Sequence, residues 1–552
     1  MKLLKFKVFS VLFLSLLLAF FGCDGEDKSE IQRASDSEIG GTIVLGETGE
    51  VSTLIPVLVH DSASSSVAGF LYDGLVKSDE DPFAEPVPHI AKSWEWSEDG
   101  LTLTVYMKDY EKFHDGHILT AEDVKFTFDC IKNPETLSNY KTSLEKFESC
   151  EVVDEFTVRF HLSTKYCPAL RSIGFSIMPA HLFTNTTIRK DNKFGEHPIG
   201  SGPYMLERWD PGKLIVLRAN PNYKLSYRGP GRFNIDRIAF LYFGDNSTLT
   251  FEFLAGLGRI GSVDLVPIQP QYLKKWRANP RINVQSYSGL GYGYFGFNLR
   301  KGKILSDKLV RQAICHAVNR DEMIDLIYQG DAKVLNGPIH PLSKFFSSKT
   351  RVYDFNPEKA KLILEEAGWV DSDGDGIRDK DGKKLSLILR TYTGYEITTQ
   401  RCVLFQSYLK KVGIDVVLSQ KEWSTFIKLF DKPDDIRWDV VTLGWGLGYD
   451  PDSDLFTTKS IRAGGNNIIG FRNPKIDELI EIGRVTCDFE DRFKIYEEYQ
   501  IIISEEAPYL FLWTRDSHLA LNLRFKGIDT KDILGVFYHF EDWSVPPELR
   551  KY

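Results

Sequence analysis

Alternating apolar residues mark the strands of this chain. Leu101, Leu103 and Val105 alternate with threonines, and this period of two predicts a strand. The strand is expected to end at the turn residues Asp115 and Gly116. Further strands are predicted over residues 385–392, 414–420 and 439–445.

Helices are predicted where a capping residue precedes a run with one apolar face. Thr120 and Asp123 have the spacing of a capping box, and the apolar residues that follow share one helical face, namely Val124, Phe128 and Ile131. Other helices are expected to begin at Ser306, at Asn356–Pro357 and at Asn473–Pro474. Strands interleaved with helices of this length are typical of α/β lobes.

Length and composition indicate a large globular protein with more than one core. The 552 residues exceed what one hydrophobic core usually supports, so two or three lobes are expected. A Gly- and Tyr-rich stretch over residues 288–297 suggests a boundary near residue 290. The net charge of -9 is spread along the chain without a basic stripe, which argues against a nucleic-acid partner.

The first 23 residues have the pattern of a secretory signal. Three lysines precede an apolar run over residues 8–21, and Cys23 follows. The run is short for a membrane-spanning helix, so we expect a signal peptide and a diacylated Cys23, since two acyl chains anchor a protein stably. Phe20 stands where bacterial lipoprotein signals usually carry leucine, which leaves ordinary cleavage or an uncleaved anchor as alternatives. Residues 24–41 are expected to be a flexible linker.

The remaining six cysteines are widely spaced and form no C-x-x-C pattern. A disulfide within residues 130–167 is one interpretation, and buried free thiols are the simpler one for a chain of this size. These residues are Cys130, Cys150, Cys167, Cys315, Cys402 and Cys487.

The sequence carries no recognisable catalytic motif. G-x-S-x-G, H-E-x-x-H and the P-loop pattern are all absent. Gly291, Gly293 and Gly296 match G-x-G-x-x-G, but the residues between them are aromatic. They therefore predict a strand and not a dinucleotide-binding loop, which must open a helix.

Two groups of residues resemble metal sites. His114, Asp115 and His117 lie in the predicted turn before the capped helix, and with no third ligand in view a solvated turn is the favoured interpretation. The second group has the spacing of a calcium loop, although Gly382 stands where a bidentate glutamate is expected. An acidic turn without metal is its alternative, and any calcium would be structural. The candidate calcium ligands are Asp371, Asp373, Asp375, Ile377 and Asp379.

Several stretches occur in the order known from one protein family. They are LYDGLV (71–76), AKSWEWSEDGLTLTVYMKDYEKFHDGHILTAEDVKFTFD (91–129), PIGSGPYML (198–206), NPNY (220–223), FGFNL (295–299), VRQAICHAVNRDEMI (310–324) and NPEKAKLILEEAGW (356–369). Together they resemble the family 5 extracellular solute-binding proteins of ABC transporters, which include oligopeptide, dipeptide and nickel binders. The resemblance extends over residues 42–545.

The resemblance implies an α/β fold with two lobes, two chain crossovers, and a ligand cleft between the lobes. Lobe I, with an extra subdomain, would comprise residues 42–290 and 515–552, and lobe II would comprise residues 291–514. It also implies a monomeric binding protein, with no cofactor and no enzymatic activity, that works with an ABC permease. Its place would be outside the cytoplasm, in the periplasm or on the outer face of the cell membrane.

For the ligand, the resemblance points to residues 444–456, directly after a predicted strand. In peptide binders of the family, the corresponding loop carries an aspartate that pairs with the ammonium group of the peptide. The matching position here is Leu447 or Gly448, and neither can pair with a cation. Asp450 and Asp452 are the nearest carboxylates, and we expect one of them to bind the ammonium; a solvated turn is the alternative.

Two tryptophans match pocket tryptophans of the family. They are Trp423 and Trp445, and Gly446 follows the second. We expect all three to contact the ligand, with core packing as the alternative for the tryptophans.

We therefore expect a lipid-anchored receptor that captures a peptide and delivers it to an ABC permease. A non-peptide ligand such as a metal chelate, haem or sugar is the main alternative, because a fold does not fix a ligand. A secreted hydrolase is disfavoured, since no nucleophile and base are recognisable.

Overall fold

The computed structural model describes residues 40–226, 233–257, 263–528 and 535–550. The predicted signal, with Cys23, and most of the predicted linker lie outside the described residues. None of the helices within the described ranges has the length and apolar character needed to cross a membrane.

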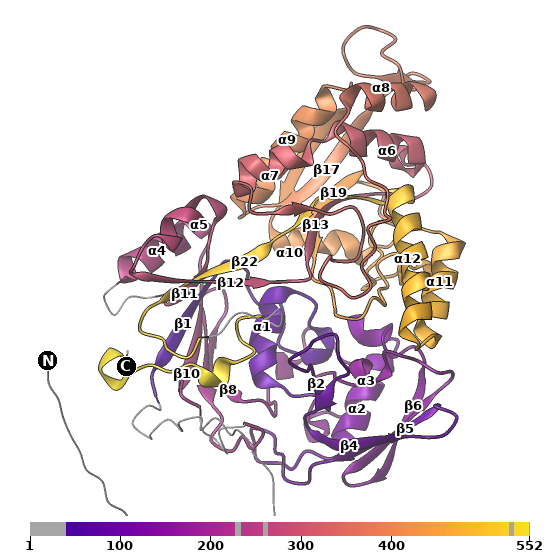
Figure 1. The fold of residues 1–552 in the computed structure, drawn as a ribbon. Coiled ribbons are helices and arrows are strands. Elements are labelled where there is room, and N and C mark those ends of the chain that lie inside the picture. Colours follow the sequence, from indigo (N-terminus) through magenta and orange to yellow (C-terminus); the bar gives the residue numbers. More distant parts are fainter. Residues whose placement is uncertain (1–39, 227–232, 258–262, 529–534, 551–552) are drawn as a thin grey trace, which may run out of the picture.

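A seven-stranded sheet forms the core of the first lobe. The central strand β1 pairs in parallel with β10 and β11, and the other pairs of the sheet are antiparallel. In sheet order the strands are β12 (Ile282–Ser288), β22 (Asp516–Asn522), β11 (Leu265–Pro267), β1 (Thr42–Glu47), β10 (Arg237–Tyr242), β9 (Leu214–Ala219) and β8 (Tyr204–Asp210). The accompanying helices are α1 (Ser62–Leu71), α4 (Asn246–Gly256) and α5 (Pro270–Arg277). Figure 1 shows α4 and α5 at one end of this sheet.

A four-stranded antiparallel subdomain extends the first lobe. Its strands are, in order, β4 (Ala91–Trp96), β5 (Thr102–Met107), β7 (Thr157–Leu162) and β6 (Phe147–Asp154), and α2 (Ala121–Lys132) packs against β6 and β7. The predicted capping box of Thr120 and Asp123 begins α2. The predicted apolar face is confirmed, since Val124, Phe128 and Ile131 are all buried. Two short strands, β2 (Val76–Lys77) and β3 (Val87–Pro88), and the one-turn helix α3 (Ala169–Ser172) complete this part.

A five-stranded sheet forms the core of the second lobe. Its order is β18 (Asp415–Lys421), β17 (Ser386–Tyr392), β19 (Val440–Trp445), β13 (Tyr292–Phe297) and β20 (Tyr509–Phe511). The three strands predicted after residue 384 are therefore confirmed to within one residue. The aromatic run over residues 292–297 is also a strand, paired with β19 and β20, as its pattern predicts.

Helices surround the second sheet (Figure 1). They are α6 (Lys308–Ala317), α7 (Arg320–Tyr328), α8 (Pro357–Glu366), α9 (Glu396–Lys410), α10 (Trp423–Ile427), α11 (Pro474–Val485) and α12 (Phe489–Glu506). The predicted caps Asn356 and Asn473 are confirmed by their side-chain hydrogen bonds to the first turn. The prediction for Ser306 was wrong by one position, because Asp307 accepts the capping bond of α6.

The chain passes between the two sheets twice. It leaves the seven-stranded sheet after β12 and enters the five-stranded sheet at β13, and it returns from β20 to β22. On the return, β21 (Trp513–Thr514) pairs with β14 (Lys333–Val334). This connectivity gives two lobes, with α11 and α12 standing over the four-stranded subdomain in Figure 1.

A disulfide joins the two lobes. Cys167 follows β7 in the subdomain, Cys487 lies between α11 and α12, and their Cα atoms are 5.3 Å apart. The expectation of free thiols was wrong for this pair, and a bridge within residues 130–167 is not formed. The partners are 320 residues apart in sequence, so only the packing of the lobes brings them together. The other four cysteines, Cys130, Cys150, Cys315 and Cys402, are free and buried, as expected.

We predict that this bridge contributes strongly to stability, because it closes a very long loop in the unfolded chain. The double variant Cys167→Ser/Cys487→Ser should lose about 2–5 kcal/mol of unfolding free energy, measured as a lower urea midpoint. A reductant should lower the midpoint of the wild type to the same extent and leave that of the double variant unchanged. An equal response of both proteins to reductant would contradict the prediction.

Candidate ligand-binding site

A cavity of about 540 Å³ lies between the two lobes. This volume is within the range of about 300–1,000 Å³ that is usual for ligand sites. The first lobe contributes Tyr166, Arg171 and Phe175 to its wall, and the second lobe contributes Trp445, Tyr499 and the loop after β19. The wall thus combines aromatic surface with a few charged groups.

The loop after β19 forms part of the cavity wall. Trp445, Gly446, Asp450 and Asp452 all line the cavity. Trp445 is held on two sides, since its Nε1 donates to the Tyr509 hydroxyl at 3.2 Å and its ring stacks on Tyr294. It therefore presents a fixed aromatic face.

Trp423 lies outside the lining of this cavity. Its ring packs edge to face against Tyr392, with centroids 4.9 Å apart, and also contacts Phe426. These contacts are those of the core-packing alternative for this tryptophan.

Asp450 forms an ion pair within the second lobe. Its two carboxylate oxygens accept hydrogen bonds from Arg492 of α12 at 2.7 and 2.8 Å. Arg492 also donates to the Gly483 carbonyl, so the loop is tied to both α11 and α12. The paired charge raises the pKa of Arg492 despite burial, which alone would lower it.

Asp452 is buried deeper and connects both lobes. Its carboxylate lies 3.0 Å from the Nε of Arg484, whose side chain is only 2% exposed. Tyr166, from the first lobe, donates a hydrogen bond to the same carboxylate at 3.1 Å. Burial raises the pKa of Asp452, and the contact with Arg484 acts in the opposite direction. Both predicted aspartates therefore already have a guanidinium partner.

The structure adds Asp454, which the sequence analysis did not single out. This residue also lines the cavity, and its carboxylate accepts hydrogen bonds from Asn466 at 2.8 Å and Ser460 at 3.1 Å. Both of these partners are neutral. Within the described part of the chain, Asp454 has no cationic side chain within ion-pair distance. Its sequence signal was available, since it is the third aspartate of the run D-P-D-S-D.

Arg171 is the cation of the first-lobe wall. Its guanidinium donates to the carbonyls of Pro82 and Ala84. Among the described residues no carboxylate forms an ion pair with it. The cavity thus has an acidic group on one lobe and a basic group on the other, and neither forms an ion pair within the described part of the chain.

His340 is the histidine of the cavity wall, and both of its ring nitrogens are engaged. Nε2 lies 2.5 Å from the Thr514 hydroxyl, and Nδ1 accepts from the Leu342 amide at 3.1 Å. Burial lowers the pKa of His340 to about 4. This side chain is therefore a structural group of the wall.

The predicted calcium loop lies on the second lobe, away from the cavity. Asp371, Asp373 and Asp375 bring carboxylate oxygens close together. The Lys384 ammonium lies 2.6 Å from Asp373 and 3.0 Å from Asp375, so a cation of the chain itself already bridges them. Asp379 accepts hydrogen bonds from the amide and hydroxyl of Ser372, and Ile377 donates its amide to Asp375.

Known proteins resemble this chain over nearly its whole length. The oligopeptide-binding protein AppA of Bacillus subtilis is 31% identical over 542 residues, covering 96% of each chain. Its solved structure in complex with a nonapeptide matches with a TM-score of 0.84, at 29% identity over 92% of this chain and 99% of that one. NikZ of Campylobacter jejuni, solved with Ni(L-His), matches with a TM-score of 0.80, at 26% identity over 91% and 99%.

A family model agrees with these relatives. Residues 85–467 match the model of the bacterial extracellular solute-binding proteins, family 5 Middle. The match covers more than half of the chain and includes both the subdomain and the loop after β19. The chain therefore belongs to family 5 of the bacterial extracellular solute-binding proteins, a family of solute-binding transporter components and not of enzymes.

Proposed function

We propose that this protein is a lipid-anchored receptor that captures peptides outside the cytoplasm and delivers them to the permease of an ABC transporter. The observation that carries this proposal is the cavity between the lobes, with aromatic walls and opposite charges on the two sides. The peptide-bound relative of similar fold supports the choice of ligand. Capture needs only a higher affinity of the ligand for the closed state of the lobes.

The charges of the wall suit a zwitterionic ligand. We assign the ammonium group of the peptide to Asp454, because a buried ammonium needs a carboxylate partner and Asp450 and Asp452 are already paired with arginines. Arg171 on the opposite lobe would then receive a carboxylate or a backbone carbonyl of the peptide. Closing the lobes brings both interactions to one ligand.

A metal chelate is less well supported than a peptide. NikZ was solved with Ni(L-His), so the fold accepts such a ligand. In this chain the nitrogens of His340 are already hydrogen-bonded. A chelate would therefore have to carry its own metal donors.

We predict that Asp454→Asn selectively weakens peptides with a free amino terminus. Peptides that co-purify with the protein would be identified by mass spectrometry and resynthesised with free and with acetylated termini. By calorimetry, the variant should bind the free form at least tenfold more weakly, about 1.4 kcal/mol, and the acetylated form with nearly unchanged affinity. Loss of a buried charge partner typically costs about 2–5 kcal/mol.

Asp450→Asn serves as the matched control for this experiment. It removes a carboxylate that Arg492 holds, so any loss of affinity should be equal for both peptide forms. If Asp450→Asn or Asp452→Asn selectively lost affinity for the free-amine peptide, that residue and not Asp454 would bind the ammonium. Equal affinity of the wild type for both forms would contradict ammonium recognition altogether.

The lipid anchor is a separate part of the proposal and has its own test. Cys23→Ser should abolish labelling of cells by a radioactive fatty acid and move the protein from the membrane fraction to the soluble fraction. Immunoblots would verify equal expression of both forms. Unchanged labelling and fractionation would show that Cys23 carries no lipid.

We further propose that Lys384, and not calcium, neutralises the loop over residues 371–379. Calcium should leave the melting temperature of the wild type unchanged, because the ammonium occupies the space between Asp373 and Asp375. The melting temperature of Lys384→Gln should rise when calcium is added, since bound metal stabilises the folded state by mass action. Lys383→Gln is the control and should behave like the wild type.

A different response of the melting temperature to calcium would contradict this proposal. If calcium raises the melting temperature of the wild type and Asp373→Ala removes that rise, the loop is a structural calcium site.

A further inference from the structure

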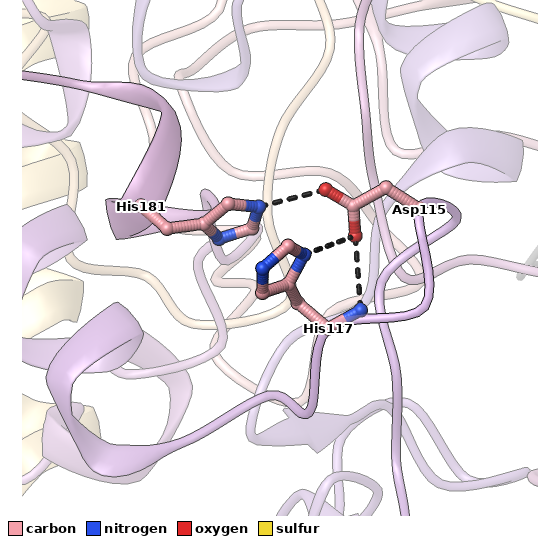
Figure 2. Close-up of side chains that lie close together, drawn as sticks. All are labelled: Asp115, His117 and His181. Carbon is pink, nitrogen blue, oxygen red and sulfur yellow. Dashed lines mark hydrogen bonds and ion pairs between the residues drawn. The ribbon is translucent and has the colours of Figure 1, made fainter.

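Two histidines and an aspartate converge on the surface of the four-stranded subdomain. Asp115 lies beside His117 and His181, with its carboxylate turned toward both rings, as Figure 2 shows. One carboxylate oxygen is 2.7 Å from His181 Nε2, and the other is 3.3 Å from His117 Nδ1. The two imidazole rings stack with centroids 3.8 Å apart. One ligand atom from each residue lies within 4.8 Å of the others.

The sequence analysis considered His114, Asp115 and His117 in this turn and favoured a solvated turn. His114 is not part of the cluster, because its ring nitrogens are engaged by the amide of Gly200 and the carbonyl of Gly202. His181, 66 residues beyond Asp115, takes its place. The third ligand that the sequence did not reveal is therefore supplied by the fold.

Both segments that carry the cluster are held by the start of α2. Asp123 caps the backbone of Thr120 with one carboxylate oxygen, at 2.8 Å. Its other oxygen accepts from the amide of Ala180, also at 2.8 Å, directly before His181. The turn of Asp115 closes on itself through the amide of His117. Hydrogen bonds thus fix the backbone segments that carry the three side chains.

The cluster differs from the acidic loop over residues 371–379 in the charged partners of its carboxylate. Within the described part of the chain, no lysine or arginine forms an ion pair with Asp115, and its partners there are the two histidines. Neutral imidazole and carboxylate groups coordinate metal ions directly. No internal ammonium has to be displaced.

We propose that Asp115, His117 and His181 bind a divalent transition metal ion of the zinc class. Two imidazoles and one carboxylate are a known three-ligand set for zinc, with water or a further donor in the open position. These residues are not among those that line the cavity between the lobes. The ion would link the turn of Asp115 to the segment of His181 and so stabilise the subdomain independently of the transported solute.

The test is zinc binding to tag-free protein, measured by calorimetry and by competition with a chromogenic chelator. The wild type should bind one zinc ion at this site and melt at a higher temperature in its presence. His117→Ala and His181→Ala should each weaken zinc by at least about tenfold, since even indirect partners of a metal typically contribute 10–100-fold. All three side chains are exposed, so the variants should remain folded, which circular dichroism would verify.

His161→Ala is the matched control. His161 also lies on the subdomain and pairs with one carboxylate, Glu151, at 3.1 Å, and it is not part of a group of three. Its removal should leave zinc affinity unchanged. Absence of zinc binding to the wild type, or equal binding by wild type and His181→Ala, would overturn the proposal. Peptide affinity is a separate measurement, and its outcome does not bear on this one.

Discussion

The buried pairing of Asp452 with Arg484 is the interaction on which the ligand site depends. Two buried charges are tolerated only when each satisfies the other, and removing one would leave the other uncompensated, at a cost of several kcal/mol. Arg484 reaches from α11 into the loop after β19, and Tyr166 completes the group from the opposite lobe. Asp450, two residues before Asp452 in the same loop, ties the loop to α12 through its ion pair with Arg492. The wall of the cavity is therefore shaped by ion pairs that precede any ligand.

The disulfide next to this group limits how the lobes can move. Cys167 directly follows Tyr166, and its amide donates to the carbonyl of Arg484. A disulfide keeps two Cα atoms within about 7 Å, so opening of the cleft has to leave this edge closed and separate the others. Non-covalent contacts between the lobes, such as the exposed pair of Lys344 and Asp81, impose no such limit. Any separation of the lobes is thus constrained by one covalent bond and the two crossovers.

Local patterns in the sequence predicted local structure, but they did not predict contacts between segments that are distant in the sequence. The capping box at Thr120 depends on residues three apart, and it is present as predicted. The bond between Cys167 and Cys487 spans 320 residues, and no spacing rule can reveal it. The arginine partners of Asp450 and Asp452 were missed for the same reason, because α11 and α12 meet the loop only in the folded lobe. Family resemblance pointed to the loop but could not say which of its charges were already satisfied.

Internal cations decide which acidic groups remain available to a ligand. In the calcium-like loop, Lys384 bridges Asp373 and Asp375, and arginines hold the two aspartates of D-P-D. Asp454 and Asp115 match no complete motif, yet in the described structure neither has a lysine or arginine partner. A carboxylate whose charge is already balanced within the chain offers little to an incoming cation, because binding would first have to break that pair. These two aspartates, which lack a lysine or arginine partner among the described residues, are therefore where we place the ammonium, in the cleft, and the metal ion, on the subdomain.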